Sequence, residues 1–451
     1  MKIQQFEDTN LAHYSYAVIN NDEIVLIDPS RNPQPYYDFA KQQGAKIVAV
    51  IETHTHADFI SSHLEISHTA NATIYASKLI GADYDHQSFD DDDAIVLGNI
   101  TLKSINTPGH SPDSISIIVI DESGKQQAVF TGDTLFIGDC GRPDLRENAG
   151  AITASRETLA RQMYHSLRSK LMILPDDVVV YPAHGAGSLC GKALSKDSSS
   201  TIGVQKRTNW SLKNMSEDDF VKELLTDQPP IPNYFGAAVA INKAGADDFM
   251  TSISNVQRRE PITCKGCANS LNPDILIIDT RPQEVFKKLH LKNAINLMDD
   301  SKFETWLGSI VNPGEQFYLI AADENILTRL IERVAKIGYE KQNVLAFTSD
   351  FGNTQTMFFD SEELKKNEEA FTIVDVRNAS EVKNNKIFSN SIHIPLDELS
   401  ERSSEIPLNK PIVVHCAGGY RSAAGSSILR LKLNEASEIF DLGIAIKDFQ
   451  K

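Results

Sequence analysis

Short apolar runs separated by turn residues fill roughly the first 200 positions of the chain, and their composition predicts β-strands. The runs are rich in isoleucine, valine and aromatic residues and span 17–19, 24–27, 47–51, 73–75, 100–105, 115–120, 128–130 and 178–180. Apolar residues recur at helical spacing over 35–43 and 155–171. Strands interleaved with helices predict a mixed α/β domain whose sheets are covered by helices.

From 203 to about 245 the pattern becomes helical, although Pro229, Pro230 and Pro232 interrupt it. We interpret this segment as helices that close the first domain, followed by an ordered connector. The remaining residues contain an internal repeat with an offset of about 96 residues.

Each repeat predicts a strand, a helix, a second strand and then a loop that opens a helix, which is typical of a parallel sheet. The matching pairs are 275–281 with 371–377, 293–297 with 390–394, and 316–321 with 411–416. The segment 361–370, rich in Glu and Lys, is the expected linker between the repeats. The predicted domains are therefore 1–260, 261–359 and 360–451.

A length of 451 residues predicts about three domains. Because 41% of the residues are hydrophobic and 23% are charged, the composition is that of ordinary soluble domains. The apolar runs are too short to span a bilayer, and the N-terminus lacks the apolar stretch of a secretory signal. We therefore expect a cytoplasmic protein with no membrane partner. A net charge of −17 argues against a nucleic-acid partner. Five cysteines, sparse and odd in number, favour reduced thiols over a disulfide framework.

Histidine and aspartate gather where predicted strands end. Residues 53–59 read Thr-His-Thr-His-Ala-Asp-Phe, His110 follows Pro-Gly, Asp133 follows Gly, and His184 precedes Gly. Imidazole and carboxylate suit zinc, iron and similar ions, and a strand end is a rigid place from which to aim a ligand. A lone histidine is more often structural, but separated motifs of the same character indicate a metal site.

The order His-x-His-x-Asp, Pro-Gly-His, Gly-Asp and Ala-His-Gly resembles the metallo-β-lactamase superfamily. The resemblance implies an αβ/βα sandwich over about residues 1–250, with a metal at one edge. Two-metal members carry a histidine directly after the aspartate, where this chain has Phe59. An apolar ring cannot bind a metal, and His63 lies a helical turn away, so we expect a mononuclear site.

One mononuclear branch of that superfamily, the persulfide dioxygenases, provides a more specific resemblance. It implies one Fe(II) per chain, bound by His54, His110 and Asp133, with positions left open for a persulfide and O₂. It also implies that neighbouring residues orient the ligands or a metal-bound water, namely His56, Asp58 and His184.

For three residues near the expected entrance to this site, the sequence allows either a functional or a purely structural role. Arg142, in a loop that resembles the one after the aspartate ligand in these dioxygenases, could bind a substrate carboxylate. It could equally form a salt bridge to Asp144 or Asp139. Cys140 and Cys190 could each hold a persulfide or be a buried, inert thiol.

A second reactive group is predicted at Cys416, which follows the strand over 411–415 and precedes a helix over 422–431. Loop amides, the helix N-terminus and the Arg421 guanidinium would lower the thiol pKa and stabilise a thiolate or persulfide anion. The loop residues expected to bind the sulfur substrate are Ala417, Gly418, Gly419 and Tyr420.

The six-residue loop from Cys416 to Arg421, together with Asp375-Val-Arg377, resembles the rhodanese family of sulfurtransferases. The phosphatase signature has one more residue in its loop. In the preceding repeat Ala321 aligns with Cys416, and no arginine follows at the matching spacing. We therefore interpret that repeat as catalytically silent.

Cys264 and Cys267 form a Cys-x₂-Cys pair just before the silent repeat. No second pair completes a tetrahedral zinc site. We interpret them as an exposed linker pair and leave a redox role open.

The prediction is an α/β multidomain protein, with a metallo-β-lactamase sandwich followed by two rhodanese-like domains with parallel sheets. The resemblances imply that O₂ oxidises a low-molecular-weight thiol persulfide, of the glutathione or coenzyme A type, to sulfite. Sulfur transfer through Cys416 would then give thiosulfate. The runner-up is a thioester hydrolase of the glyoxalase II type, and a third hypothesis is a persulfide carrier or sensor without turnover. A homo-oligomer is compatible with the family.

Overall fold

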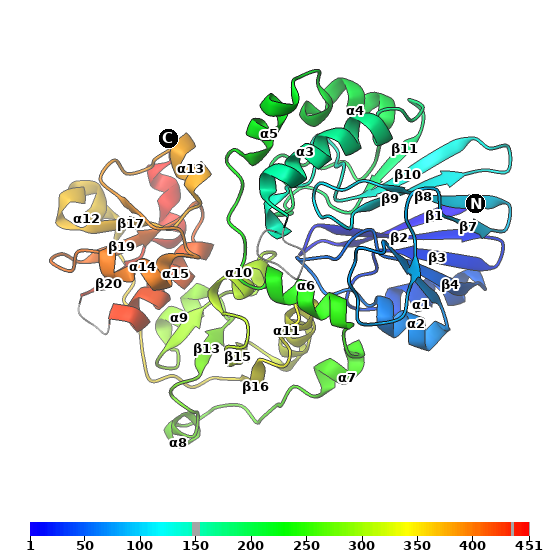
Figure 1. The fold of residues 1–451 in the computed structure, drawn as a ribbon. Helices are drawn as coiled ribbons and strands as arrows, with labels where there is room; N and C mark the ends of the chain where they lie inside the picture. Colours follow the sequence, from blue (N-terminus) through cyan, green and yellow to red (C-terminus); the bar gives the residue numbers. More distant parts are fainter. Residues whose placement is uncertain (147–153, 434–436, 451) are drawn as a thin grey trace. The chain divides into compact units, whose positions relative to one another are not determined.

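The computed structural model describes residues 1–146, 154–433 and 437–450 (Figure 1). They divide into two compact units, Met1–Ser252 with Ala335–Gly338, and Ile253–Val334 with Tyr339–Lys451. Within the described ranges, the helices are all too short or too polar to cross a membrane.

The first unit contains two six-stranded mixed sheets. The first sheet has the order β1-β2-β3-β4-β5-β6, with strands Lys2–Asp8, His13–Asn20, Glu23–Ile27, Lys46–Ile51, Thr73–Ala76 and Gln87–Ser88. The second has the order β12-β11-β10-β9-β8-β7. From β7 to β12 its strands are Ala94–Leu97, Ile100–Asn106, Ile115–Ile120, Gln126–Gly132, Val179–Pro182 and Ser200–Thr201.

Alternation along the strands explains the layers, because successive side chains point to opposite faces. In β3, Val25 and Ile27 join the core between the two sheets, whereas Ile24 and Leu26 join the core under the helices. Helices α1 (Gln34–Gln43) and α2 (His63–Ala70) contribute Tyr36, Phe39 and Ile66 to that outer core.

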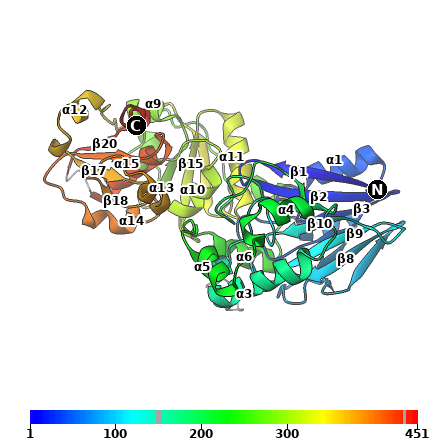
Figure 2. The same ribbon diagram turned by 90° about the horizontal axis from the view of Figure 1, so that it is seen from above.

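On the other side, α3 (Arg156–Ser166) packs Ala160 and Met163 against Val129 and Val180 of the second sheet. Figure 2 shows α1 and α3 on opposite outer faces of the paired sheets. The expected αβ/βα sandwich is therefore confirmed.

The chain after β12 is helical, as predicted, with α4 (Ile202–Thr208), α5 (Glu217–Leu225), α6 (Phe235–Ala244) and α7 (Phe249–Ser254). The proline-containing stretch lies between α5 and α6. The predicted helix over 155–171 begins at Arg156 and ends in a π-helical turn over Leu167–Leu171.

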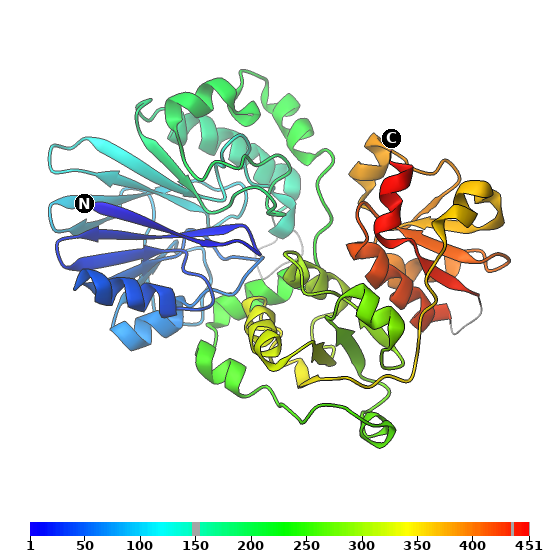
Figure 3. The ribbon, with the colours of Figure 1, turned by 180° about the vertical axis from the view of Figure 1, so that it is seen from behind.

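The second unit contains two four-stranded sheets in which every strand pair is parallel, as predicted (Figures 1 and 3). The order β14-β13-β15-β16 is built from β13 Leu276–Asp279, β14 Ala294–Asn296, β15 Phe317–Ala321 and β16 Asn343–Thr348. The order β18-β17-β19-β20 is built from β17 Thr372–Asp375, β18 Ile392–His393, β19 Ile412–His415 and β20 Ile439–Asp441.

Helices connect and cover these parallel strands. They are α8 Lys265–Asn269, α9 Gln283–Lys288, α10 Phe303–Ile310, α11 Glu324–Lys336, α12 Ser361–Lys366, α13 Ala379–Asn384, α14 Leu399–Arg402 and α15 Tyr420–Leu433.

The segment 361–370 differs from the expected linker because it begins with the helix α12. Asp360 caps this helix by accepting a hydrogen bond from the backbone N–H of Glu362. Acidic residues in its first turn and lysines in its last complement the helix dipole. Leu364 packs in the core of the second repeat, so this segment is part of a folded domain.

The Asp-x-Arg motif forms the same buried ion pair in both repeats. In the first, Nε and Nη2 of Arg281 lie 2.9 and 2.6 Å from the two carboxylate oxygens of Asp279. Arg377 and Asp375 repeat these distances. Each arginine also donates to a backbone carbonyl, that of Leu289 or Asn385. The motif therefore ties a strand end to the helix that follows it.

Removal of one partner would leave an uncompensated buried charge, so Arg281→Met is expected to lower the free energy of unfolding by about 3–5 kcal/mol. The double variant Asp279→Leu/Arg281→Met should lose less. Trp210 and Trp306 are the only tryptophans in the chain. Trp306 fluorescence during urea unfolding, in a Trp210→Phe background, therefore reports on the second unit. A loss below about 1 kcal/mol, the range of exposed pairs, would contradict the prediction.

Candidate metal centre and sulfur-transfer loop

The three predicted metal ligands meet at one edge of the first unit. His54 follows β4, His110 follows β8, and Asp133 follows β10. One ligand atom from each lies within 4.8 Å of the others, and all three side chains are buried. Nε2 of His110 is 3.5 Å from Oδ2 of Asp133. Two imidazoles and a carboxylate are the donors with which proteins hold ferrous iron while leaving positions open.

Hydrogen bonds fix which nitrogen of each histidine faces the centre. Nδ1 of His110 lies 2.9 Å from the carbonyl oxygen of Arg142, which can only accept, so Nδ1 carries the proton. The Thr53 hydroxyl donates to Asp28 and therefore accepts from Nδ1 of His54, 3.0 Å away. Nε2 is thus the unprotonated nitrogen in both rings and the one available to a metal.

Asp133 provides the test of whether a metal fits. Both its carboxylate oxygens are buried, and neither accepts a hydrogen bond from any N–H or O–H group of the described residues. Oδ1 lies 3.5 Å from Nε2 of His184, on the side away from His110. The Cys190 thiol, a weak donor, hydrogen-bonds to this carboxylate, but a buried charge with so little compensation is unfavourable. A bound cation removes that cost. The residues therefore fit a metal ion.

Asp58, His184 and Cys190 form an adjoining group, again with ligand atoms within 4.8 Å of one another. Nδ1 of His184 donates to the carbonyl of Ala12, and its Nε2 lies 3.3 Å from Asp58. Burial raises the pKa of the Cys190 thiol well above its usual value, and the charges of Asp58 and Asp133 add to this effect. Cys190 is thus a neutral thiol beside the centre.

His56 faces two carboxylates that the sequence did not single out. Its Nε2 lies 3.2 Å from Oδ1 of Asp28 and 3.4 Å from Oε2 of Glu52. Burial opposes a charge on this ring, but the two carboxylates raise the pKa of His56 well above its ordinary value. Its position is consistent with the predicted role of orienting neighbouring ligands.

Phe59 fills the position of the missing histidine with a buried ring. Its centre lies 4.0 Å from the ring centre of His13 and 4.4 Å from that of His56. His63 lies against Glu52 and the ring of Tyr84. None of the ligand groups found among the described residues includes His63.

Besides Glu52, three residues that hold the site were missed. His13 begins β2 and forms a β-bridge with His184, but no motif surrounds it in the sequence. Asp28 accepts hydrogen bonds from the backbone and hydroxyl of Thr53. Asp113 does the same for Thr55. Asp28 directly follows a predicted strand, so the signal that revealed the ligands was present there too.

Arg142 forms the salt bridge that the sequence allowed, with Nε and Nη2 lying 2.7 and 2.6 Å from the two oxygens of Asp144. Its contact with a substrate carboxylate stays a prediction. Cys140 packs in the hydrophobic core beneath the second sheet. Burial, followed by the charge of Asp139, raises the pKa of its thiol well above the usual value.

Gly141 explains how this loop passes over the metal ligands. A Cβ atom there would lie 1.9 Å from the backbone oxygen of Asp133 and 3.0 Å from Cβ of His110. Only glycine allows so close an approach.

The second reactive group, Cys416, lies buried at the end of β19. The Gly419 N–H donates to its sulfur at 3.1 Å, and the Ser422 hydroxyl oxygen is 3.7 Å away. Gly419 has φ of 103°, and a Cβ there would lie 3.0 Å from the backbone of Gly443. The loop therefore wraps around the sulfur at the N-terminus of α15, and its role in stabilising a sulfur anion stays a prediction.

One part of this loop is exposed to solvent, and its other end is held by a hydrogen bond. Ala417 and Gly418 are exposed beside the buried sulfur. The Tyr420 hydroxyl donates to the carbonyl of Met298 in the preceding repeat at 3.1 Å. A small substrate would therefore approach across Ala417 and Gly418.

Arg421 is paired with a carboxylate that the sequence analysis missed. Its Nη1 and Nη2 lie 2.5 and 2.9 Å from the two oxygens of Glu381. Burial opposes ionisation of Glu381, yet the hydrogen bonds from Arg421 lower its pKa. The positive charge of the Arg421 guanidinium is thus neutralised by Glu381 in this structure. The Gly419 amide is the donor that contacts the sulfur.

Strand register identifies the residue of the first repeat that corresponds to Cys416. Asp279 pairs with Ile320 in the first repeat, and Asp375 pairs with His415 in the second. The next residues, Ala321 and Cys416, are therefore equivalent.

Upstream, exposed Cys264 caps α8 by accepting a hydrogen bond from the Cys267 amide. Hydrogen bonding with Cys267 lowers the pKa of Cys264.

Comparisons with known proteins identify the two kinds of domain that carry these residues. Residues 8–184 match the metallo-beta-lactamase superfamily, and residues 267–348 and 360–447 each match the rhodanese-like domain. The mitochondrial persulfide dioxygenase ETHE1 of Homo sapiens is 31% identical over 243 residues, covering 53% of this chain and 86% of that protein.

Two further relatives extend the comparison. The crystal structure of a metallo-beta-lactamase from Staphylococcus aureus is 31% identical, with a TM-score of 0.66, and covers 77% of this chain and 98% of that one. The cytoplasmic hydroxyacylglutathione hydrolase of Arabidopsis thaliana is 31% identical over 176 residues, covering 38% of this chain and 63% of that protein.

The geometry predicts that Asp133→Asn removes metal binding, because it replaces the charged ligand by a neutral amide. Bound metal per chain, measured by plasma mass spectrometry after dialysis, should fall to about a tenth or less of the wild-type value. Asp121→Asn, in an exposed turn, makes the same chemical change as a control. Equal metal content in the two variants would show that Asp133 is not a ligand.

Proposed function

We propose, since this chain belongs to the metallo-β-lactamase superfamily and continues into two rhodanese-like domains, that it oxidises a thiol persulfide and transfers sulfur. The observation that carries the proposal is the buried set of His54, His110 and Asp133, with Phe59 in place of a further ligand. The first domain, over 1–260, would perform the oxidation. The silent domain spans 261–359, and the transfer domain 360–451.

Fe(II) held by His54, His110 and Asp133 would supply open positions at which a persulfide sulfur and O₂ can meet. The chain itself orients the two histidines through Arg142 and Thr53. Burial of Asp58 and His184 keeps bulk water away from the reacting sulfur. The similarity to the persulfide dioxygenases supports this chemistry.

The oxidation balances as RSSH + O₂ + H₂O giving RSH, sulfite and two protons. The terminal sulfur loses electrons, O₂ gains them, and the S–S bond breaks. RSSH is a low-molecular-weight thiol persulfide of the glutathione or coenzyme A type.

The transfer requires no oxidant. The Cys416 thiolate attacks the terminal sulfur of a second RSSH, which releases RSH and leaves a persulfide on Cys416. Sulfite then attacks that outer sulfur, so thiosulfate forms and the thiolate returns. The Gly419 N–H, 3.1 Å from the sulfur, would stabilise the negative charge in both states.

The direct test is anaerobic purification followed by metal analysis and an oxygen electrode. We expect about one iron per chain and sustained O₂ uptake on addition of glutathione persulfide. Zinc in place of iron, with hydrolysis of a glutathione thioester and no O₂ uptake, would replace this proposal by a hydrolase of the hydroxyacylglutathione type. Consumption of a single equivalent of persulfide without turnover would indicate a carrier.

Cys416→Ser should abolish thiosulfate formation and leave O₂ uptake within about twofold of wild type, because the two sites use different residues. Sulfite should accumulate instead. Cys264→Ser, which removes an exposed thiol outside both sites, is the matched control and should retain thiosulfate formation. Sulfur transfer that survives in Cys416→Ser would exclude Cys416 as the carrier.

A further inference from the structure

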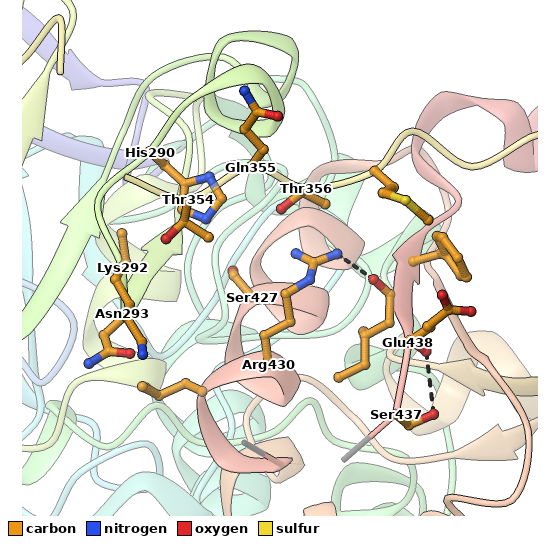
Figure 4. Close-up of a pocket in the computed structure, with 15 residues that line it drawn as sticks. His290, Lys292, Asn293, Thr354, Gln355, Thr356, Ser427, Arg430, Ser437 and Glu438 are labelled. Atoms are coloured by element: carbon orange, nitrogen blue, oxygen red, sulfur yellow. Dashed lines mark hydrogen bonds between the residues drawn. The ribbon is translucent and has the colours of Figure 1, made fainter. Parts of the chain in front are cut away.

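The second unit contains a pocket of about 560 Å³ on the seam between the silent and the transfer repeats (Figure 4). We call it the seam pocket, and its polar lining includes His290, Thr354 and Thr356 of the silent repeat and Arg430 of the transfer repeat. Its volume lies in the range that small organic ligands occupy. Neither predicted reactive group lines it.

A cation without an acidic partner faces the seam pocket. Arg430, near the end of α15, donates through Nη2 to the carbonyl of Ile439 at 2.5 Å. Among the described residues, no carboxylate lies within ion-pair distance of it, although Glu438 lines the same pocket and the charge of Asp441, which is paired with Lys287, acts on it from farther away. Burial lowers the pKa of Arg430 to about 10. A half-buried guanidinium in this setting is stabilised by an anion.

Thr356 provides an independent sign of a ligand. Its side chain is 6% exposed, and its hydroxyl has no hydrogen-bond partner among the described residues. Figure 4 shows the Thr356 hydroxyl and the Arg430 guanidinium on the same side of the pocket. A buried hydroxyl without a partner is unfavourable, so both groups point to a bound oxygen acceptor.

His290 restricts what else the ligand contains. Its Nδ1 donates to the carbonyl of Phe286 at 2.7 Å, and burial lowers the ring pKa to about 4. At neutral pH its Nε2 is therefore an acceptor. It would repel a second anionic oxygen but would accept a hydrogen bond from an N–H group.

We propose that the seam pocket binds the carboxylate end of an amino acid or short peptide. Arg430 and Thr356 donate to the carboxylate, and His290 accepts a hydrogen bond from a ligand N–H. This inference does not rest on the proposed function, because it involves neither the metal centre nor Cys416.

The test is ligand-observed saturation-transfer NMR on the full chain with glycylglycine as the probe. Wild type should show saturable binding. Arg430→Gln should weaken it about tenfold or more, the usual effect of losing a charge-assisted hydrogen bond. Thr356→Val, which keeps the shape of the side chain, should weaken it several-fold. Arg207→Gln makes the same charge change at an exposed position on α4 and should bind like wild type.

Three further probes define the ligand class. Acetate, which has the carboxylate but no N–H, should bind more weakly than glycylglycine. S-methylglutathione, a peptide without a free thiol, should compete with glycylglycine if thiol peptides are the natural occupants. Its failure to compete, with glycylglycine still bound, would assign the pocket to other peptides.

Tighter binding of inorganic phosphate than of glycylglycine would overturn the carboxylate assignment. Unchanged glycylglycine binding in both Arg430→Gln and Thr356→Val would show that the pocket is not the binding site. Absence of saturable binding by wild type would reject the proposal. If Arg430→Gln fails to fold, Thr356→Val alone decides between these outcomes.

Discussion

Asp133 lies buried at one edge of the paired sheets, between Nε2 of His110 and Nε2 of His184. No N–H or O–H group of the described residues donates to its carboxylate, so its charge is uncompensated by ordinary hydrogen bonds. The strands, the close approach of Gly141 and the carboxylates behind the histidines all keep this group in place. Such an arrangement is unfavourable unless a cation binds, which is why a metal centre explains the fold of this edge.

The second unit contains the same parallel-sheet fold twice, but the two copies differ in the residue that precedes the loop. Both repeats end their first strand in the same buried Asp–Arg pair, and both place a helix after the strand that carries Ala321 or Cys416. At this position only the second repeat has a sulfur, and the Gly419 amide contacts it. The first repeat provides the Met298 carbonyl that anchors the loop through Tyr420. The copy that lacks the cysteine thus still supports the copy that carries it.

Strands and the positions where they end could be predicted from the sequence, because apolar runs and turn residues are local signals. They missed β1 (Lys2–Asp8), whose half-polar sequence is typical of an edge strand. They also missed the pairing of Arg421 with Glu381, which are 40 positions apart, and the seam pocket, whose walls come from both repeats. Such contacts depend on how elements pack, so no spacing rule reveals them. Asp28 and Asp113 escaped because a lone aspartate in a loop next to a strand is usually solvated.

The claim that most needs a test is that the two reactive groups act in sequence on one sulfur substrate. The number of persulfide molecules consumed per O₂ measures it directly. The proposed reactions predict two persulfides per O₂, with one thiosulfate formed, because sulfite from the first reaction takes up the sulfur of the second persulfide. One persulfide per O₂, with sulfite as the only product of the intact chain, would contradict the account.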